Sequence, residues 1–266
     1  MHASGGDGPS TGPLEWLLEA SRTAAPADVG RLAGEALRRT GARASGIYLV
    51  DHDQSMLHPL ASGPGHGGGE GSFPVDGTVG GRAFAHESTV TMALDEGVRL
   101  WVPLLDGTAR VGVLSVDVDG DVDGPVDDGQ AALVTTCANL IAELIVAKGR
   151  YSDVFERVRR HREMTLEAEL QRSIVPPVAL VTEALAVAGM LLPAYKVAGD
   201  TFDYALDEDR LQLAVIDSVG HELESSVLSH QVWGSRRNSP RKGDARERGY
   251  APADAPLAPV VPHTPF

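Results

Sequence analysis

The chain has 266 residues, more than the roughly 100–200 of a common single domain, so one complete domain and part of another are expected. Hydrophobic residues make up 42% of it and charged residues 23%, which is enough apolar material for a core. The formal net charge of -14 would repel nucleic-acid phosphates and anionic lipid, so neither nucleic acid nor a membrane is an expected partner.

Two further features predict a cytoplasmic protein. Residues 1–13 are rich in Gly and Ser, lack the apolar segment of a signal peptide and are predicted to be disordered. No later stretch approaches the roughly 18 uninterrupted apolar residues of a membrane helix.

Cys137 is the only cysteine, which excludes an internal disulfide, and its apolar neighbours indicate a place in the core.

The first part of the chain predicts two helices followed by a hairpin. Apolar residues recur at helical spacing in 14–18 and again in 29–37. Two apolar runs, 45–50 and 56–60, are separated by a short polar turn and predict paired strands. The glycine-rich stretch 63–71 predicts a loop, because glycine makes a regular element costly.

The next elements complete an α+β layout. Residues 77–86 (GTVGGRAFAH) predict a short helix, 98–104 and 111–118 predict strands, and a long helix begins at Gln130. The histidines nearby show no regular ligand spacing and are interpreted as surface or loop residues: His52, His58, His66 and His86.

The order of these elements resembles the GAF family of sensor domains. The resemblance covers 14–148 and rests on the helix pair, the IYLV strand, the GTVGGRAFA helix, and the VPL and VGVLSVD strands. It implies a pocket for a small ligand between the sheet and its loops. The sequence names no ligand-defining residue, so a ligand-binding sensor and a purely structural fold both remain open.

The long helix is predicted to run past Arg150 and to form a coiled-coil linker over 149–175. Its apolar residues step by four and three, which is typical of a dimer seam: Cys137, Ile141, Leu144, Tyr151, Phe155 and Val158. A homodimer through this helix is therefore expected. The alternative is that the stripe packs on its own sensor domain.

A second domain is predicted after Val175-Pro176-Pro177, because proline ends the helix. Apolar runs at 187–192 and 211–216 predict strands, with Asp200 and Asp217 each just after a strand-like segment. Residues 231–266 are basic and then rich in Pro and Ala, and are predicted to be a disordered tail. Incidental disorder is favoured over nucleic-acid binding for this tail.

Three motifs in this second domain resemble the opening of PPM-type, SpoIIE-like protein phosphatases. They are LQRSIVPP (170–177), the AGDTFDY segment (198–204) and IDSVGH (216–221). The resemblance implies a partial α/β-sandwich over 176–230. It also implies that Asp200, Asp217 and the Ser218 carbonyl ligate Mn²⁺ or Mg²⁺, hard cations that prefer oxygen. The implied reaction is hydrolysis of a phosphoserine or phosphothreonine on a signalling protein, such as an anti-sigma-factor antagonist.

Departures from this pattern predict an incomplete catalytic domain. Glu222 stands where the family has a glycine, Glu224 adds further negative charge, and the family's later strands and two downstream aspartates are missing. A truncation with an altered reading frame is the expected cause. The function hypotheses are an incomplete phosphatase, a non-catalytic GAF and coiled-coil module that dimerises with a full-length relative, and a degenerate product without function.

Overall fold

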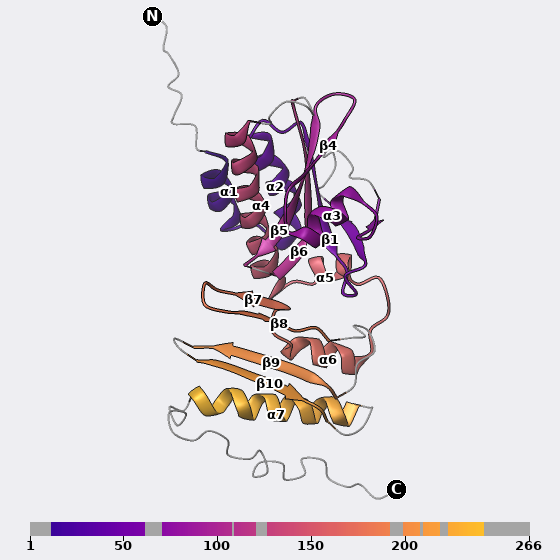
Figure 1. Ribbon diagram of the computed structural model, residues 1–266, viewed down its shortest axis with the longest axis vertical. Coiled ribbons are helices and arrows are strands. Elements are labelled where there is room, and N and C mark those ends of the chain that lie inside the picture. The colour runs from indigo at the N-terminus through magenta and orange to yellow at the C-terminus, as the bar shows by residue number, and fades with distance from the viewer. Residues whose placement is uncertain are drawn as a thin grey trace, which may run out of the picture. The chain divides into compact units, whose positions relative to one another are not determined.

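The computed structural model describes residues 12–61, 71–107, 109–120, 127–191, 199–207, 210–218 and 223–241. The chain divides into two compact units, an N-terminal unit, Met1–His161, and a C-terminal unit, Arg162–Phe266 (Figure 1). Most of the predicted disordered N-terminus and glycine-rich loop, residues 1–11 and 62–70, lies outside the described residues.

The N-terminal unit is built on a six-stranded sheet with the order β3-β2-β1-β6-β5-β4. Every pair of neighbouring strands is antiparallel. Four strands confirm the apolar runs of the sequence: β1 (Ala44–Val50), β2 (Met56–Leu60), β5 (Val98–Asp106) and β6 (Ala109–Val118). The two edge strands were not predicted: β3 (Phe73–Pro74) and β4 (Val90–Ala93).

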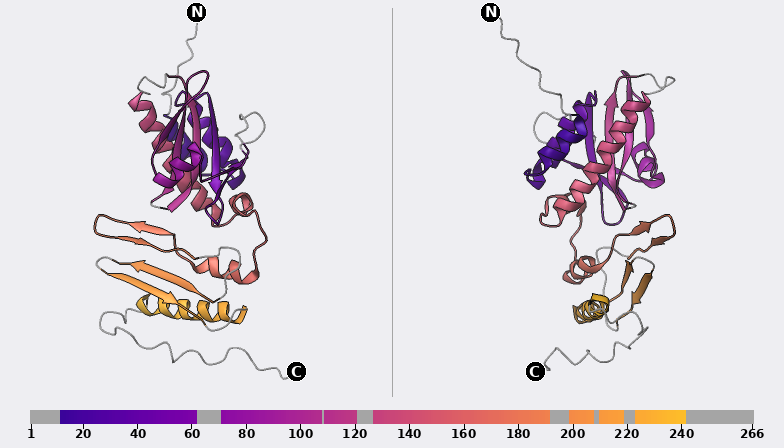
Figure 2. Two further views of the ribbon diagram at one scale, coloured as in Figure 1. Left: turned by 45° about the vertical axis from the view of Figure 1, so that its right-hand side comes forward. Right: turned by 90° about the vertical axis from the view of Figure 1, so that its left-hand side faces the viewer.

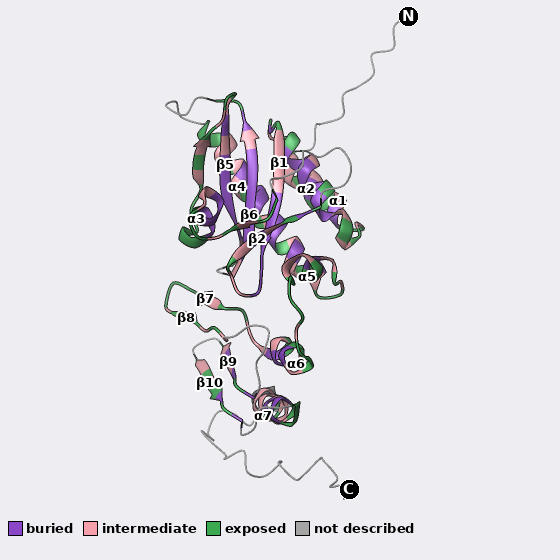
Figure 3. Cartoon of the chain, turned by 90° about the vertical axis from the view of Figure 1, so that its right-hand side faces the viewer, coloured by how far each residue is buried: buried purple, intermediate pink, exposed green. Residues whose placement is uncertain are grey.

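Helices cover both faces of this sheet. The unit contains α1 (Pro13–Ser21), η1 (Pro26–Asp28), α2 (Val29–Arg38), α3 (Val79–His86), α4 (Asp128–Gly149) and α5 (Val154–Arg159). Alternate residues along a strand point to opposite faces, so β1 sends Leu49 into the aliphatic core with α1, α2 and α4, and sends Tyr48 into a second cluster with α3. Figures 2 and 3 show α4 along one face and the buried strands between the helices.

The GTVGG motif allows α3 to approach the sheet closely. Thr78 caps the helix by accepting a hydrogen bond from the backbone N–H of Gly81 at 3.0 Å. A Cβ on Gly81 would collide with the carbonyl of Val75, and one on Gly80 would lie 2.9 Å from the Phe73 and Trp101 rings. Glycine is therefore required at both positions for this packing.

The prediction of a continuous linker helix over 149–175 is wrong. Helix α4 ends at Gly149, α5 ends at Arg159, and α6 (Leu166–Ile174) begins separately with its own cap, Thr165. The break after Gly149 is stabilised where Ser152 Oγ accepts a hydrogen bond from the N–H of Val154.

Except for the exposed Tyr151, the proposed coiled-coil stripe instead packs within the N-terminal unit, which was the alternative. Cys137, Ile141 and Phe155 are buried in its core, and Leu144 and Val158 pack against that core. Lys148 is also buried and donates from Nζ to the carbonyl of Ala24 at 2.8 Å. Burial raises the pKa of the Cys137 thiol to about 11, in line with the predicted core position.

Helix α4 is also the one described helix that is long and apolar enough to cross a membrane by length and composition. Its buried residues lie in the core of the N-terminal unit, among them Val134 and Ile145. A central core helix of a folded domain meets the same criteria, so the composition of α4 is explained by its packing.

The described residues of the C-terminal unit form two hairpins and two helices. The elements are α6, β7 (Ala179–Val181), β8 (Ala186–Ala188), β9 (Thr201–Leu206), β10 (Leu211–Ile216) and α7 (Leu223–Arg241). Strand β7 pairs with β8, and β9 pairs with β10. The predicted strand 211–216 is confirmed as β10. Of the predicted strand 187–192, only residues 187–188 lie in a described strand, the short β8.

The prediction of disorder from residue 231 is wrong for residues 231–241, which continue α7. The reason is visible in the charged residues of this segment, which pair with a buried carboxylate described below. Residues 242–266, the rest of the predicted tail, lie outside the described residues.

Candidate functional site

The β9–β10 hairpin brings the two predicted aspartate ligands together. Thr201 of β9 pairs with Ile216 of β10, so Asp200 directly before β9 and Asp217 directly after β10 lie at the same end. Asp200 thus precedes its strand, which corrects the predicted position after one. Both side chains are exposed. The pKa of Asp200 is raised by desolvation and by the charge and hydrogen bond of the Asp217 carboxylate.

The LQRSIVPP and AGDTFDY motifs contact each other. Gln171 of the LQRSIVPP motif is fully buried and donates from Nε2 to the backbone carbonyl of Asp200. Tyr204 of the second motif donates from its hydroxyl to the carbonyl of Pro177 at 2.8 Å. These bonds join α6 and its exit to β9, which fixes the backbone that carries Asp200.

The third predicted ligand, Ser218, lies beside the same backbone. A Cβ on Gly199 would lie 2.8 Å from the Ser218 carbonyl oxygen, and Gly199 has a φ of +83°, which only glycine adopts readily. The Ser218 carbonyl therefore faces the residue next to Asp200. Ser218 Oγ is 2.7 Å from Ser229 Oγ, and Ser229 also hydrogen-bonds the carbonyls of Gly199 and Ser225.

The donor set suits a hard divalent cation only in part. Two carboxylates in contact attract a cation, and Mn²⁺ and Mg²⁺ prefer such oxygen ligands. An octahedral ion needs about six ligands, and no third His, Cys, Asp or Glu of the described residues forms a group with Asp200 and Asp217. Glu222 lies outside the described residues. The pair can hold an ion through two carboxylates, with water filling the other positions.

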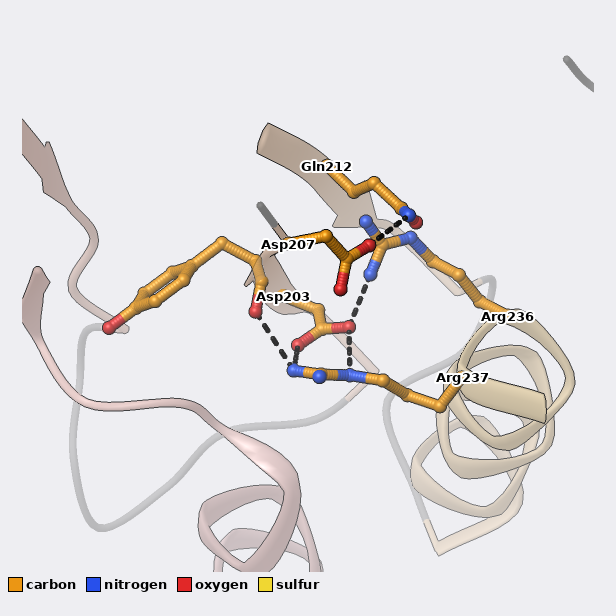
Figure 4. A network of polar contacts seen from close by, with 6 residues as sticks. Asp203, Asp207, Gln212, Arg236 and Arg237 are labelled. Carbon is orange, nitrogen blue, oxygen red and sulfur yellow. Dashed lines mark hydrogen bonds and ion pairs between the residues drawn. The ribbon is translucent and has the colours of Figure 1, made fainter. Parts of the chain in front are cut away.

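Another aspartate of the AGDTFDY motif has a structural role. Asp203 is buried in β9 and accepts hydrogen bonds from both Arg236 and Arg237 of α7, with Arg237 Nε at 2.8 Å (Figure 4). Arg237 also donates to the carbonyl of Tyr204 at 2.9 Å. Sequence reasoning missed this pairing because the basic run was assigned to a disordered tail.

The second candidate site lies in the N-terminal unit, between the sheet and α3. Tyr48, Phe73 and Trp101 form an aromatic cluster, with ring centroids 4.9 Å apart for Tyr48 and Phe73 and 5.4 Å apart for Phe73 and Trp101. Within the described part of the chain, the buried Trp101 Nε1 has no hydrogen-bond partner. A hollow of about 400 Å³ beside α3 is lined in part by Val75 and Val79, which also pack against this cluster.

The sequence matches no family model, and it matches no curated protein. Several solved structures resemble about half of this chain. The second GAF domain of DevS from Mycobacterium smegmatis has 28% identity and a TM-score of 0.38, covering 48% of this chain and 99% of that one. The GAF domain of the Escherichia coli potassium sensor histidine kinase KdpD has 20% identity and a TM-score of 0.39, covering 52% and 94%.

The GAF domain of an Acinetobacter phosphoenolpyruvate-protein phosphotransferase has 13% identity and a TM-score of 0.44, covering 53% of this chain and 93% of that one. The N-terminal unit itself has an α+β layout, with an antiparallel sheet and helices on both faces.

Proposed function

We propose that this chain is a non-catalytic, cytoplasmic signalling module in which the GAF-like N-terminal unit binds a small planar ligand. One observation carries the proposal: the buried Trp101 Nε1 has no hydrogen-bond partner among the described residues. A buried donor without a partner costs about 1–3 kcal/mol. A ligand with an acceptor atom would remove this cost.

The surroundings of Trp101 define the ligand class. Tyr48 and Phe73 offer ring faces and edges close to the indole, and the nearby hollow shares Val75 and Val79 with this cluster. Aromatic side chains favour offset or edge-to-face packing with another ring. A neutral heteroaromatic compound with at least one ring acceptor therefore suits the chemistry of the cluster.

The test is a thermal-shift and fluorescence titration of the full chain with quinoline and adenine as probes. Binding to the wild-type chain is expected, and Trp101→Phe should weaken it about 3–10-fold, since an aromatic ring is kept at this position and one hydrogen bond is lost. Trp16→Phe is the matched control, because Trp16 lies on α1 and packs with the other cluster. Equal binding by all three proteins, or by none, contradicts the proposal.

A second candidate, phosphatase activity of the PPM type on a phosphorylated signalling protein, is favoured by the contact between Asp200 and Asp217. Our proposal of a non-catalytic module predicts that p-nitrophenyl phosphate with Mn²⁺ is turned over no faster by the wild-type chain than by the Asp200→Asn, Asp217→Asn double variant. Faster turnover by the wild type would support the phosphatase instead.

Pairing with a full-length relative is a further part of the proposed role. The interrupted helix removes the coiled-coil argument for it, because all the seam residues except the exposed Tyr151 lie in the core of the N-terminal unit or pack against it. Co-purification of the chain with such a relative, compared with the relative alone, tests whether mixed dimers form.

A further inference from the structure

A group of metal-binding side chains outside both candidate sites gathers in the N-terminal unit. Asp51 follows β1, His58 lies in β2, and His161 follows α5. One potential ligand atom from each lies within 4.8 Å of the others. From this arrangement we propose that Asp51, His58 and His161 bind a divalent transition-metal ion, with Zn²⁺ as the best-suited ion.

The chemistry of the donors selects the ion. Two imidazole nitrogens and one carboxylate oxygen suit Zn²⁺ and its transition-metal neighbours, whereas Mg²⁺ and Ca²⁺ prefer oxygen alone. Tetrahedral bonds of about 2.0–2.2 Å require ligand atoms roughly 3.4 Å apart. The Asp51 Oδ2 to His161 Nδ1 distance is 3.5 Å, so this pair already has the required spacing. Three protein ligands leave one position for water.

The supporting bonds orient the ligands toward one another. Asp51 accepts hydrogen bonds from the N–H and hydroxyl of Ser55, at 2.7 and 2.9 Å. His58 Nδ1 lies 2.8 Å from Ser72 Oγ, so its Nε2 is the nitrogen left for a metal. That Nε2 atom is buried and has no hydrogen-bond partner among the described residues. Partners of this kind fix the orientation and tautomer of metal-binding histidines.

The backbone that carries His161 is fixed beside the first hairpin. Arg159 donates from Nε to the carbonyl of Val50 at 2.9 Å, and His52 Nε2 lies 2.9 Å from Glu156 Oε2. Phe155 is buried in the core of the unit, and Figure 3 shows α5 close to β2. His52 lies in the turn between β1 and β2, in agreement with its interpretation as a surface or loop histidine, and its side chain is buried there.

The position of the site predicts that metal binding affects the end of the N-terminal unit. His161 is the last residue of the N-terminal unit. A bound ion would tie this end of the unit to the β1–β2 hairpin, which makes the exit segment responsive to metal. Amide exchange in residues 154–161 is expected to slow when Zn²⁺ binds.

The test is calorimetric titration of the full chain with Zn²⁺, supported by visible absorption with Co²⁺ as a spectroscopic probe. One Zn²⁺ per chain is expected, with affinity lowered at least 10–100-fold by His161→Ala and by His58→Gln. His161 is exposed, so its removal leaves the core intact. The His86→Ala variant is the matched control, since His86 is an exposed histidine at the end of α3.

Two results would overturn the proposal. The first is equal Zn²⁺ affinity in the wild type and in both ligand variants. The second is loss of Zn²⁺ binding only in the Asp200→Asn, Asp217→Asn double variant, which would place the ion at the other hairpin. Slower exchange of residues 154–161 in the wild type but not in His161→Ala would support the proposal independently.

Discussion

The two units of the chain use the same antiparallel pairing but cover their strands very differently. Strand β6 sends Leu114 into the aliphatic core and Val113 into the cluster under α3, and both are fully buried. Strand β10 of the C-terminal unit leaves Leu213 60% exposed and Val215 88% exposed. Apolar strands therefore form in both units, but only the N-terminal unit gains the full free energy of burying them.

Polar interactions replace part of the missing core in the C-terminal unit. Buried Asp203 is paired with two arginines, and Ser218 and Ser229 hydrogen-bond near the start of α7. Directional bonds of this kind fix a backbone, but their net contribution to stability is modest. We expect the N-terminal unit to resist unfolding and the C-terminal unit to depend on a few named contacts.

The largest expected effect comes from shortening one apolar side chain in each unit and comparing the two losses of stability. Leu114→Ala should lower the free energy of unfolding of the N-terminal unit by about 3–4 kcal/mol, because it opens a cavity in a packed core. Val215→Ala in β10 should cost less than about 0.5 kcal/mol, because its side chain is already exposed.

Segment-resolved hydrogen exchange measures both effects, because two units need not unfold together. A cost above about 1.5 kcal/mol for Val215→Ala would show that this face of β10 is covered in solution. A small cost for Leu114→Ala would contradict the packed core.

The sequence predicted the N-terminal unit well because its signals are local. The apolar runs at 45–50, 56–60, 98–104 and 111–118 became strands, and the GTVGGRAFAH segment became α3. Edge strands β3 and β4 were missed, since Phe73–Pro74 is too short to show a period and Val90–Ala93 is only half-buried. The helical period of 130–158 was recognised, but a period does not reveal which surface it packs on.

The candidate sites were predicted where a motif carried them and missed where only the fold did. Asp200, Asp217 and Ser218 were named from motifs, and the hairpin brings their backbones together. Asp51, His58 and His161 were not grouped, because His161 lies more than a hundred positions from Asp51 in the chain. The pairing of Asp203 with Arg236 and Arg237 depends on α7, which the basic composition of its C-terminal part concealed.

The next effect tests the dependence of the C-terminal unit on one ion pair. Asp203→Asn should destabilise α7 and β9 by about 2 kcal/mol, because two arginines lose their charged partner. The arginines keep some solvent contact, which limits the cost. Exchange of the α7 amides measures it.

Asp207→Asn is the matched control, since Asp207 is exposed and its hydrogen bond from Gln212 is 3.4 Å long (Figure 4). It should change exchange in α7 very little. If Asp203→Asn also leaves α7 unchanged, the arginine pairing does not hold this helix.

The smallest expected effect tests the packed core of the N-terminal unit through the buried thiol of Cys137. Burial raises the pKa of Cys137 from 9.0 to about 11. Well below pH 9 the thiol is protonated in both the folded and the unfolded chain, so its ionisation does not lower the free energy of unfolding. Between pH 9 and 11 only the unfolded chain loses the proton, so stability falls as the pH rises.

At pH 9.5 the loss attributable to Cys137 should be about 1 kcal/mol, since a full pKa unit corresponds to about 1.4 kcal/mol. Urea unfolding at pH 7.5 and 9.5 measures it, with Cys137→Ala as the comparison, because other groups also titrate over this range. The variant should lose less stability than the wild type between the two pH values. Equal losses would mean that the thiol is no harder to ionise in the folded unit than in the unfolded chain, which conflicts with a dry core around α4.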